Sequence, residues 1–244
     1  MKKYNIEHKN DIAVLCRKNE TAEKVHLLFK TPSKLFIDTE LDRFSSYWAR
    51  FFCDFLRCYY DKNIYGIDFV NAYFDREYQS KSYFKALDVV NKLFSLRDTD
   101  LFNNVSLIIL LAEMVYPKYK NEEVVVKLKQ ILLNYNQRSS FKPADDNQIC
   151  ILTLHKSKGL EYKAVFLLDL YKWIFPREKC SKDNYIQDLN LHYVGITRSK
   201  EVCYIMQGNK RFSKQYGTYI NAEESSFLKF YNLPSLRCNI DWEG

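Results

Sequence analysis

The chain lacks several features that would each point to a simple function. Its six glycines form no G-x-x-x-x-G-K-[ST] loop, and no predicted strand ends in the acidic pair that holds Mg²⁺ beside a nucleotide. No apolar run approaches the roughly 18 residues that span a bilayer. The polar start MKKYNIEHKND lacks the apolar core of a signal peptide. These absences predict a chain without a phosphate-binding loop or a membrane span, located in the cytoplasm.

Cysteine usage also excludes two classes of protein. The seven cysteines are an odd number without a C-x-x-C pair, and several lie in apolar runs such as those around Cys53 and Cys150. We interpret them as buried free thiols and expect neither disulfides nor a structural metal. The hydrophobic content of 47% and the aromatic content of 16% predict a folded chain. A net charge of +7 indicates by itself only solubility and weak attraction to polyanions.

The most informative segment is residues 149–170, ICILTLHKSKGLEYKAVFLLDL. Its two apolar runs, 149–154 and 164–170, predict strands buried on both faces, as in a parallel sheet. The loop between them carries three lysines and a glycine. The carboxyl edge of such a sheet is where phosphates bind, so we expect the cations at that edge. Taken alone, such a loop is more often a surface connection.

A second informative segment is LHYVGITRSKEVCYI, residues 191–205. Ile186, Leu189, Tyr193 and Ile196 recur at helical spacing and predict a helix over 185–197 with that face buried, followed by a strand over 202–206. Arg198 then lies at the carboxyl end of the helix, where the helix dipole favours a cation. A plain capping arginine would occupy the same place.

The motifs HKSKGLEY and YVGITRSK resemble the fifth and sixth signature motifs of superfamily 1 DNA helicases of the UvrD/Rep type, in that order and spacing. DIAVLCR at residues 11–17 resembles the strand that opens the second motor domain of that family. Ile174-Phe175-Pro176 resembles the hydrophobic-Phe-Pro step after the fifth motif. The middle of the chain, with TELDR at residues 39–43, is similar to the helicase-like subunit of the Gabija anti-phage system.

This resemblance implies an α/β fold, a RecA-like parallel sheet flanked by helices. The lobe is similar to that of P-loop NTPases but lacks the P-loop, and it carries an inserted, mostly helical subdomain. We expect residues 1–31 and 146–244 to form the lobe, called 2A in the family, and residues 32–145 to form a reduced 2B-like insertion. Helical spacing predicts a first helix capped by Asn19 with Ala22, Val25, Leu28 and Phe29 as its stripe.

The insertion shows apolar residues at helical spacing over most of its length. The aromatic stripe from Trp48 to Tyr60 predicts a core helix capped by Ser45 or Ser46. Further helices are predicted over residues 67–74, 82–94, 106–116 and 122–135. Tyr73, Tyr78 and Tyr83 are candidates for contacts with DNA or a partner, but we favour ordinary packing for them.

The resemblance also implies a nucleotide site shared with a second lobe. ATP and Mg²⁺ would be held mainly by an N-terminal RecA-like lobe, in the same longer protein or in a separate subunit, and this chain alone is not expected to hydrolyse ATP. Arg198 matches the arginine finger that neutralises charge on the γ-phosphate. Glu161 matches the residue that contacts the ribose, and Lys158 and Gly159 shape its loop.

For DNA, the resemblance implies contacts from the first half of the same loop. Thr153, His155 and Lys156 match positions near a single DNA strand, whose phosphates such a motor grips in a salt-dependent way. The implied function is the C-terminal motor half of a 3′-to-5′ DNA helicase. The alternative is a non-catalytic, helicase-derived module that binds single-stranded DNA or a partner protein.

Three mild departures from the family pattern remove no charged group. Lys156-Ser157 stands where relatives commonly have Ser-Ala, Ser199 replaces a frequent alanine, and Asp188 replaces a usual glutamate. Arg17 is interpreted as structural, because the other γ-phosphate arginine of the family belongs to a motif that this chain lacks.

Overall fold

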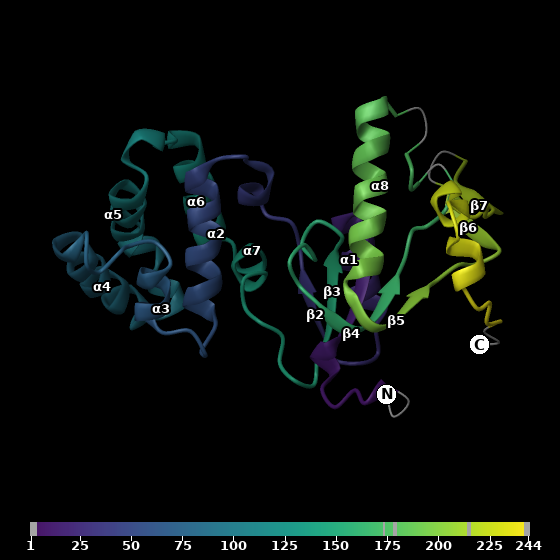
Figure 1. The fold of residues 1–244 in the computed structure, drawn as a ribbon, viewed down its shortest axis with the longest axis horizontal. Coiled ribbons are helices and arrows are strands. Elements are labelled where there is room, and N and C mark those ends of the chain that lie inside the picture. Colours follow the sequence, from purple (N-terminus) through teal and green to yellow (C-terminus); the bar gives the residue numbers. More distant parts are fainter. Residues whose placement is uncertain (1–3, 173, 178–179, 214–215, 242–244) are drawn as a thin grey trace. The chain divides into compact units, whose positions relative to one another are not determined.

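The structure, a computed structural model, describes residues 4–172, 174–177, 180–213 and 216–241 (Figure 1). The chain divides into two compact units, one made of residues 1–35 and 144–244 and the other of residues 36–143. The predicted boundaries, after residues 31 and 145, lie close to these. The helical unit is therefore inserted between two parts of the other unit in the sequence.

The first unit is built on a five-stranded sheet in the order β2-β3-β1-β4-β5. The strands are β1 (Ile12–Cys16), β2 (Ser33–Phe36), β3 (Ile149–Thr153), β4 (Tyr162–Leu167) and β5 (Ser199–Ile205). The central strand β1 pairs in parallel with β3 and β4, and β4 pairs in parallel with β5. Strand β1 is buried along its whole length, as expected for a strand covered on both faces. The predicted α/β fold with a mostly parallel sheet is confirmed.

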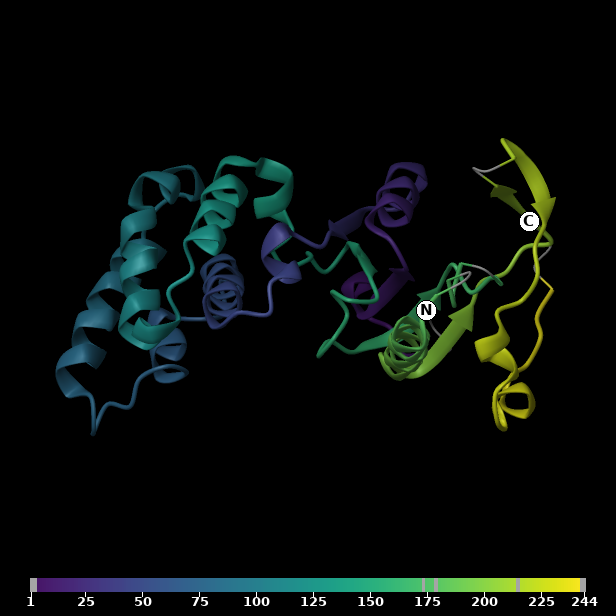
Figure 2. The same cartoon turned by 90° about the horizontal axis from the view of Figure 1, so that it is seen from above.

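Helices α1 (Asn19–Leu28) and α8 (Lys182–Thr197) cover opposite faces of this sheet (Figure 2). Successive side chains of a strand point to opposite faces, and β4 shows which face belongs to which helix. Phe166 packs in a cluster with Val14 and with Ala22 of α1. The next residue, Leu167, lies under Gly195 of α8. The sheet is thus the middle layer of three.

Helix α8 has the predicted carboxyl end but buries a different face from the one predicted. Ile186 and Tyr193 of the predicted stripe are 44% and 68% exposed. The buried residues, again at helical spacing, are Asp188, Leu191, His192 and Gly195. Three of these four are polar or glycine, so a count of apolar residues could not find this face. A Cβ at position 195 would lie 2.8 Å from Leu154 Cδ2, so glycine allows α8 to pack this closely on the sheet.

Helix α1 departs from its prediction in two ways. Its N-cap residue is Lys18, and Asn19 is the first helical residue. Of the predicted stripe only Ala22 is fully buried, whereas Leu28 is 81% exposed. The expected helix exists, but its apolar face is only partly covered within this unit.

The second unit is helical. Its helices are α2 (Tyr47–Tyr60), α3 (Gly66–Asn71), α4 (Ser80–Phe94), α5 (Val105–Val115), α6 (Glu122–Leu133) and α7 (Tyr135–Ser139). The aromatic stripe of α2 forms the centre of the core, where Trp48, Phe51 and Phe55 are fully buried. Each such side chain contributes roughly 1.5–3 kcal/mol by leaving water. Ser46 caps the helix, since its hydroxyl accepts a hydrogen bond from Ala49 N at 3.1 Å.

Two of the three candidate tyrosines in this unit are packing residues. Tyr83 is buried, and its hydroxyl donates to Asn71 at 2.8 Å. The Tyr73 hydroxyl donates to Asp54 at 2.9 Å. Tyr78 is exposed. The prediction that these tyrosines are packing residues therefore holds for Tyr73 and Tyr83 but not for Tyr78.

The chain ends with a two-stranded antiparallel hairpin, β6 (Lys210–Ser213) and β7 (Thr218–Asn221), followed by two 3₁₀ turns. All seven cysteines are free thiols. Cys16, Cys53 and Cys150 are buried as predicted, whereas Cys238 is exposed. Within the described parts of the chain, no helix combines the length and apolar character that crossing a bilayer requires.

Candidate functional site

The loop between β3 and β4, residues 154–161, is fixed from within by two buried side chains. The Ser157 hydroxyl donates to Leu154 O at 2.9 Å. The Thr153 hydroxyl accepts a hydrogen bond from Lys156 N at 3.3 Å, and Thr153 is fully buried. Thr153 therefore orders the loop. Its side chain is buried, and the match of this position to one near a DNA strand stays a prediction.

Gly159 gives the loop its sharp change of direction. Its φ of +80° lies in the left-handed region that favours glycine. A Cβ there would meet no atom within 4 Å, so the requirement comes from the backbone alone. The turn leaves Lys158 and Glu161 exposed to solvent.

Arg198 joins the two motifs into one site. It follows the last residue of α8, and its Nε donates to Val194 O at 3.2 Å in the last turn of that helix. Its Nη1 donates to Leu160 O at 3.0 Å, which fastens the guanidinium to the loop after β3. The backbone reinforces this junction, because Tyr162 N donates to Arg198 O at 2.8 Å. The two predicted motifs therefore meet in space.

Glu161 lies beside the same junction. Its carboxylate pairs with Lys200 Nζ at 3.1 Å, and both side chains are more than half exposed. An exposed pair of this kind adds about 0–1 kcal/mol to stability. Its main consequence is orientation, because it holds one carboxylate oxygen beside a cation next to Arg198.

The position of this junction on the sheet differs from the prediction. Tyr162 and Ser199 are the first residues of β4 and β5, and they are in register with each other. Glu161 and Arg198 therefore lie at the amino edge of the sheet, not at the carboxyl edge where the phosphate rule places ligands. Thr153 ends β3 at the opposite edge, level with Cys16. Between the carboxyl edge and the amino edge, the loop therefore runs back over one strand length, roughly 15 Å.

His155 and Lys156 are the predicted residues that remain at the carboxyl edge. His155 is exposed and Lys156 is half-buried. They directly follow the buried Thr153 and Leu154. Within this loop, His155 and Lys156, predicted for DNA, thus lie near its start, and Gly159 and Glu161, predicted for nucleotide, lie near its end beside Arg198.

Asp188 and two arginines form a buried ionic cluster that the sequence did not predict. The fully buried Asp188 carboxylate pairs with Arg17 Nη2 at 2.9 Å and with Arg177 Nε at 3.2 Å. It also accepts a hydrogen bond from Arg177 N at 3.1 Å. The Arg17 guanidinium lies 5.6 Å from the centre of the Phe175 ring. Its side chain is 13% exposed and paired within the protein, which agrees with the interpretation of Arg17 as structural.

His192 lies one helical turn after Asp188 and is held neutral. Burial lowers the pKa of its imidazole to about 4. The ring packs against Phe175 and Phe227, with centroid separations of 6.3 and 5.5 Å. No hydrogen bond reaches its Nε2 from the described residues. The imidazole is therefore a packing group that cannot accept a proton without cost.

Acidification is expected to destabilise the α/β unit through His192. Its pKa of about 4 in the folded state lies below the ordinary 6.5, so the stabilisation is complete above pH 6.5 and is lost as the pH falls toward 4. We expect a loss of about 2 kcal/mol, below the full value of the shift because the site can relax. Urea unfolding at pH 7 and pH 4.5 measures it. His192→Leu should show a smaller pH dependence, and an unchanged dependence would contradict this assignment.

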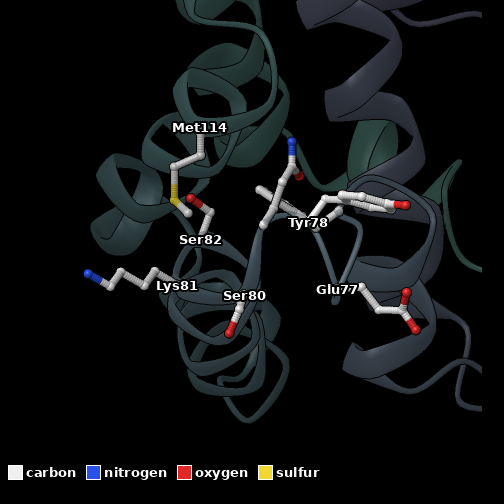
Figure 3. A pocket seen from close by; sticks show the side chains of 8 residues that line it. Glu77, Tyr78, Ser80, Lys81, Ser82 and Met114 are labelled. Atoms are coloured by element: carbon white, nitrogen blue, oxygen red, sulfur yellow. The ribbon is translucent and has the colours of Figure 1, made fainter.

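A hollow of about 460 Å³ opens at the amino end of α4 in the helical unit (Figure 3). Phe74, Tyr78, Ser82 and Met114 contribute to its lining, and the Lys81 side chain extends away from it. None of the residues predicted for nucleotide or DNA in the two motifs lines this hollow. Its lining also holds no pair of carboxylates and no histidine, so its chemistry suggests no reaction.

The hairpin β6–β7 presents aromatic side chains beside basic ones. Phe212, Tyr216 and Tyr219 are 53%, 66% and 69% exposed, and Phe212 and Tyr219 pack edge to face at 5.6 Å. Lys210 and Arg211 lie on the same hairpin. Exposed aromatics interleaved with cations suit the stacking of bases in a single strand. The signal was present as KRF and YGTY at residues 210–212 and 216–219.

No group of three or more His, Cys, Asp and Glu side chains is placed to hold a metal ion in the described ranges.

Comparison with known proteins gives consistent matches. The UvrD-like helicase C-terminal domain family matches residues 62–210, which is more than half of the chain. The chain is 27% identical over 171 residues to the ATP-dependent DNA helicase Rep of Salmonella typhimurium, covering 68% of this chain and 23% of that protein. It is 37% identical over 98 residues to the Rep helicase of Buchnera aphidicola from Acyrthosiphon pisum, covering 40% of this chain and 14% of that protein.

A third relative is the ATP-dependent DNA helicase PcrA of Leuconostoc citreum, 34% identical over 85 residues. That match covers 34% of this chain and 11% of PcrA. The chain thus spans less than a quarter of the length of each of these relatives. The similarity to the Gabija subunit stays a prediction.

Proposed function

This chain belongs to the UvrD-like helicase C-terminal domain family, and on that premise we propose that it is the carboxyl-terminal motor region of an ATP-dependent DNA helicase of the UvrD/Rep type. The observation that carries the proposal is the junction of the two motifs through Arg198 and Leu160 O. The motor would be completed by an N-terminal RecA-like lobe, and its 3′-to-5′ direction follows from the family alone.

The hydrogen bonds of Arg198 fit the role of an arginine finger. A guanidinium carries five N–H donors. Nε, Nη1 and Nη2 each donate one bond within the lobe, to Val194 O, Leu160 O and Thr197 Oγ1. As far as the described residues are concerned, two N–H groups, one on each terminal nitrogen, remain for an incoming anion such as the γ-phosphate of ATP. The arginine would meet its substrate already oriented.

Glu161 is proposed to bind the ribose of the same nucleotide. Its carboxylate is exposed and is oriented by Lys200, so an oxygen is available to accept a hydrogen bond from a ribose hydroxyl. Gly159 gives the loop its direction, and the exposed Lys158 adds positive charge beside the phosphates. The phosphate-binding loop and the Mg²⁺ ligands are assigned to the other lobe, where Mg²⁺ would neutralise the phosphate charge.

Single-stranded DNA is proposed to bind at the other end of the loop. His155 and Lys156 lie at the carboxyl edge of the sheet, and the hairpin β6–β7 offers exposed aromatics beside cations. Thr153 and Ser157 fix residues 153–157 internally, and we propose that a movement at Glu161 is passed to His155 through this segment. The loop would in this way couple the state of the nucleotide to the grip on DNA.

The proposal is tested by joining this chain to its N-terminal lobe and measuring ATP hydrolysis with and without a single-stranded oligonucleotide. We expect hydrolysis that the oligonucleotide stimulates, and binding of the oligonucleotide that weakens between 50 and 200 mM salt, conditions over which phosphate contacts lose strength. Salt-sensitive binding without stimulated hydrolysis would favour the alternative, a non-catalytic module. If the joined protein shows neither oligonucleotide binding nor ATP hydrolysis, the motor and the DNA-binding form of the alternative are both overturned, and a module that binds a partner protein is left.

A further inference from the structure

The hydroxyl of Thr197 connects the end of α8 to the guanidinium of Arg198. Thr197 Oγ1 lies 3.0 Å from Tyr193 O and 3.1 Å from Val194 O, the carbonyls of the preceding turn. On its other side it accepts a hydrogen bond from Arg198 Nη2 at 3.3 Å. We infer that Thr197 is a positioning residue, which aims the arginine finger at the nucleotide; this inference rests on the proposed function.

The direction of these bonds follows from the chemistry of a hydroxyl. Its single proton must be donated to one of the two carbonyls, because a carbonyl oxygen can only accept. A lone pair is then left for Arg198 Nη2, which can only donate. Threonine is also branched at Cβ, which restricts rotation about χ1 and keeps the oxygen in place. The acceptor is thus fixed before any ligand arrives.

Among the three acceptors that the structure gives the guanidinium, Thr197 Oγ1 is the one on a side chain. Val194 O and Leu160 O belong to the backbone and stay in place when side chains are replaced. Three acceptors in different directions determine both the position and the plane of the guanidinium. Two acceptors would leave the guanidinium one rotation that is not determined. Thr197 therefore contributes the part of the orientation that a substitution can remove.

A merely structural role makes a different prediction. Thr197 Oγ1 also contacts the carbonyls of the last helical turn, and in a structural role its loss would act only by loosening α8. Such loosening would lower thermal stability and would slow hydrolysis whether or not Arg198 is present. A positioning role acts only through Arg198 and leaves binding of ATP and DNA unchanged. The two roles are separated by combining substitutions.

The experiment uses the complete motor and four variants: Thr197→Val, Thr197→Ser, Arg198→Ala and the combination of Thr197→Val with Arg198→Ala. Thr197→Val keeps the shape and removes the hydroxyl; we expect kcat to fall about tenfold, with KM for ATP and Kd for the oligonucleotide unchanged, since small misplacements of a catalytic group are costly. Thr197→Ser keeps the hydroxyl and should retain most of kcat. In the Arg198→Ala background Thr197→Val should cause no further loss.

Each other outcome is decisive. An equal loss from Thr197→Val in both backgrounds, or an undiminished kcat in Thr197→Val while Arg198→Ala is inactive, would overturn the positioning role and leave the proposed function intact. Undiminished hydrolysis in Arg198→Ala would instead overturn the function proposed for the arginine. If Thr197→Val does not fold, Thr197→Ala replaces it in the comparison with and without Arg198.

Discussion

Replacing Arg198 with alanine is expected to lower DNA-stimulated ATP hydrolysis by the complete motor by roughly 10³-fold or more, the range known for arginine fingers. The reason is electrostatic: the substitution removes a positive charge and the two N–H donors left for the phosphate from the place where negative charge develops. Binding of single-stranded DNA should persist, because Arg198 and His155 lie at opposite edges of the sheet. Steady-state hydrolysis and oligonucleotide titration measure the two effects.

Two further variants make this prediction specific. Arg198→Lys keeps the charge but loses the planar fork that holds Val194 O and Leu160 O, so it should restore little of the rate. Arg57→Ala removes an arginine of an exposed pair with Asp54 in the helical unit and should leave hydrolysis unchanged. A rate in Arg198→Ala within a few-fold of the unmodified motor would show that this guanidinium does not touch the reacting phosphate.

Replacing Asp188 with alanine is expected to destabilise the α/β unit by about 3–5 kcal/mol, the usual cost of removing one partner from a buried ionic cluster. The substitution leaves the largely buried guanidinium of Arg17 without its anion. It also removes the acceptor for Arg177 N and Arg177 Nε. The change in unfolding free energy can be measured with urea on the chain itself.

A matched control for Asp188 exists in the same unit. Glu223 pairs with Lys172 at 2.6 Å, but both side chains are about half exposed. Glu223→Ala should therefore cost under about 1 kcal/mol. Asp188→Asn should lie between the two, because an amide keeps one acceptor oxygen for Arg17 and loses the charge. Equal costs for Asp188→Ala and Glu223→Ala would show that the buried cluster adds no stability beyond that of a surface pair.

The sequence predicted the elements of the α/β unit better than the faces of its helices. The β-branched apolar runs identified β1, β3 and β4, because a strand covered on both faces leaves little room for polar residues. The buried face of α8 was predicted wrongly because polar residues lie on it. Its buried face contains Asp188 and His192, whose burial depends on partners far away in the sequence, namely Arg17 and Phe227.

The site was predicted as a set of residues but not as an arrangement. That the two motifs meet could be expected from their resemblance, and Arg198 does bond to the loop of Glu161. A motif gives positions along the chain and no side-chain direction, so the burial of Thr153 could not be read from it. The amino-edge location of Arg198 depends on the strand pairing of β4 with β5, which is a property of the whole sheet.

Strand β1 has a consequence for how the protein is made. Both of its sheet neighbours, β3 and β4, lie beyond residue 148, after the entire helical unit. During translation β1 leaves the ribosome long before either neighbour has been synthesised, and closing so long a segment is entropically costly. The helical unit has all of its own residues by position 143. A chain truncated at residue 143 would contain all residues of the helical core together with a strand that lacks both of its sheet neighbours.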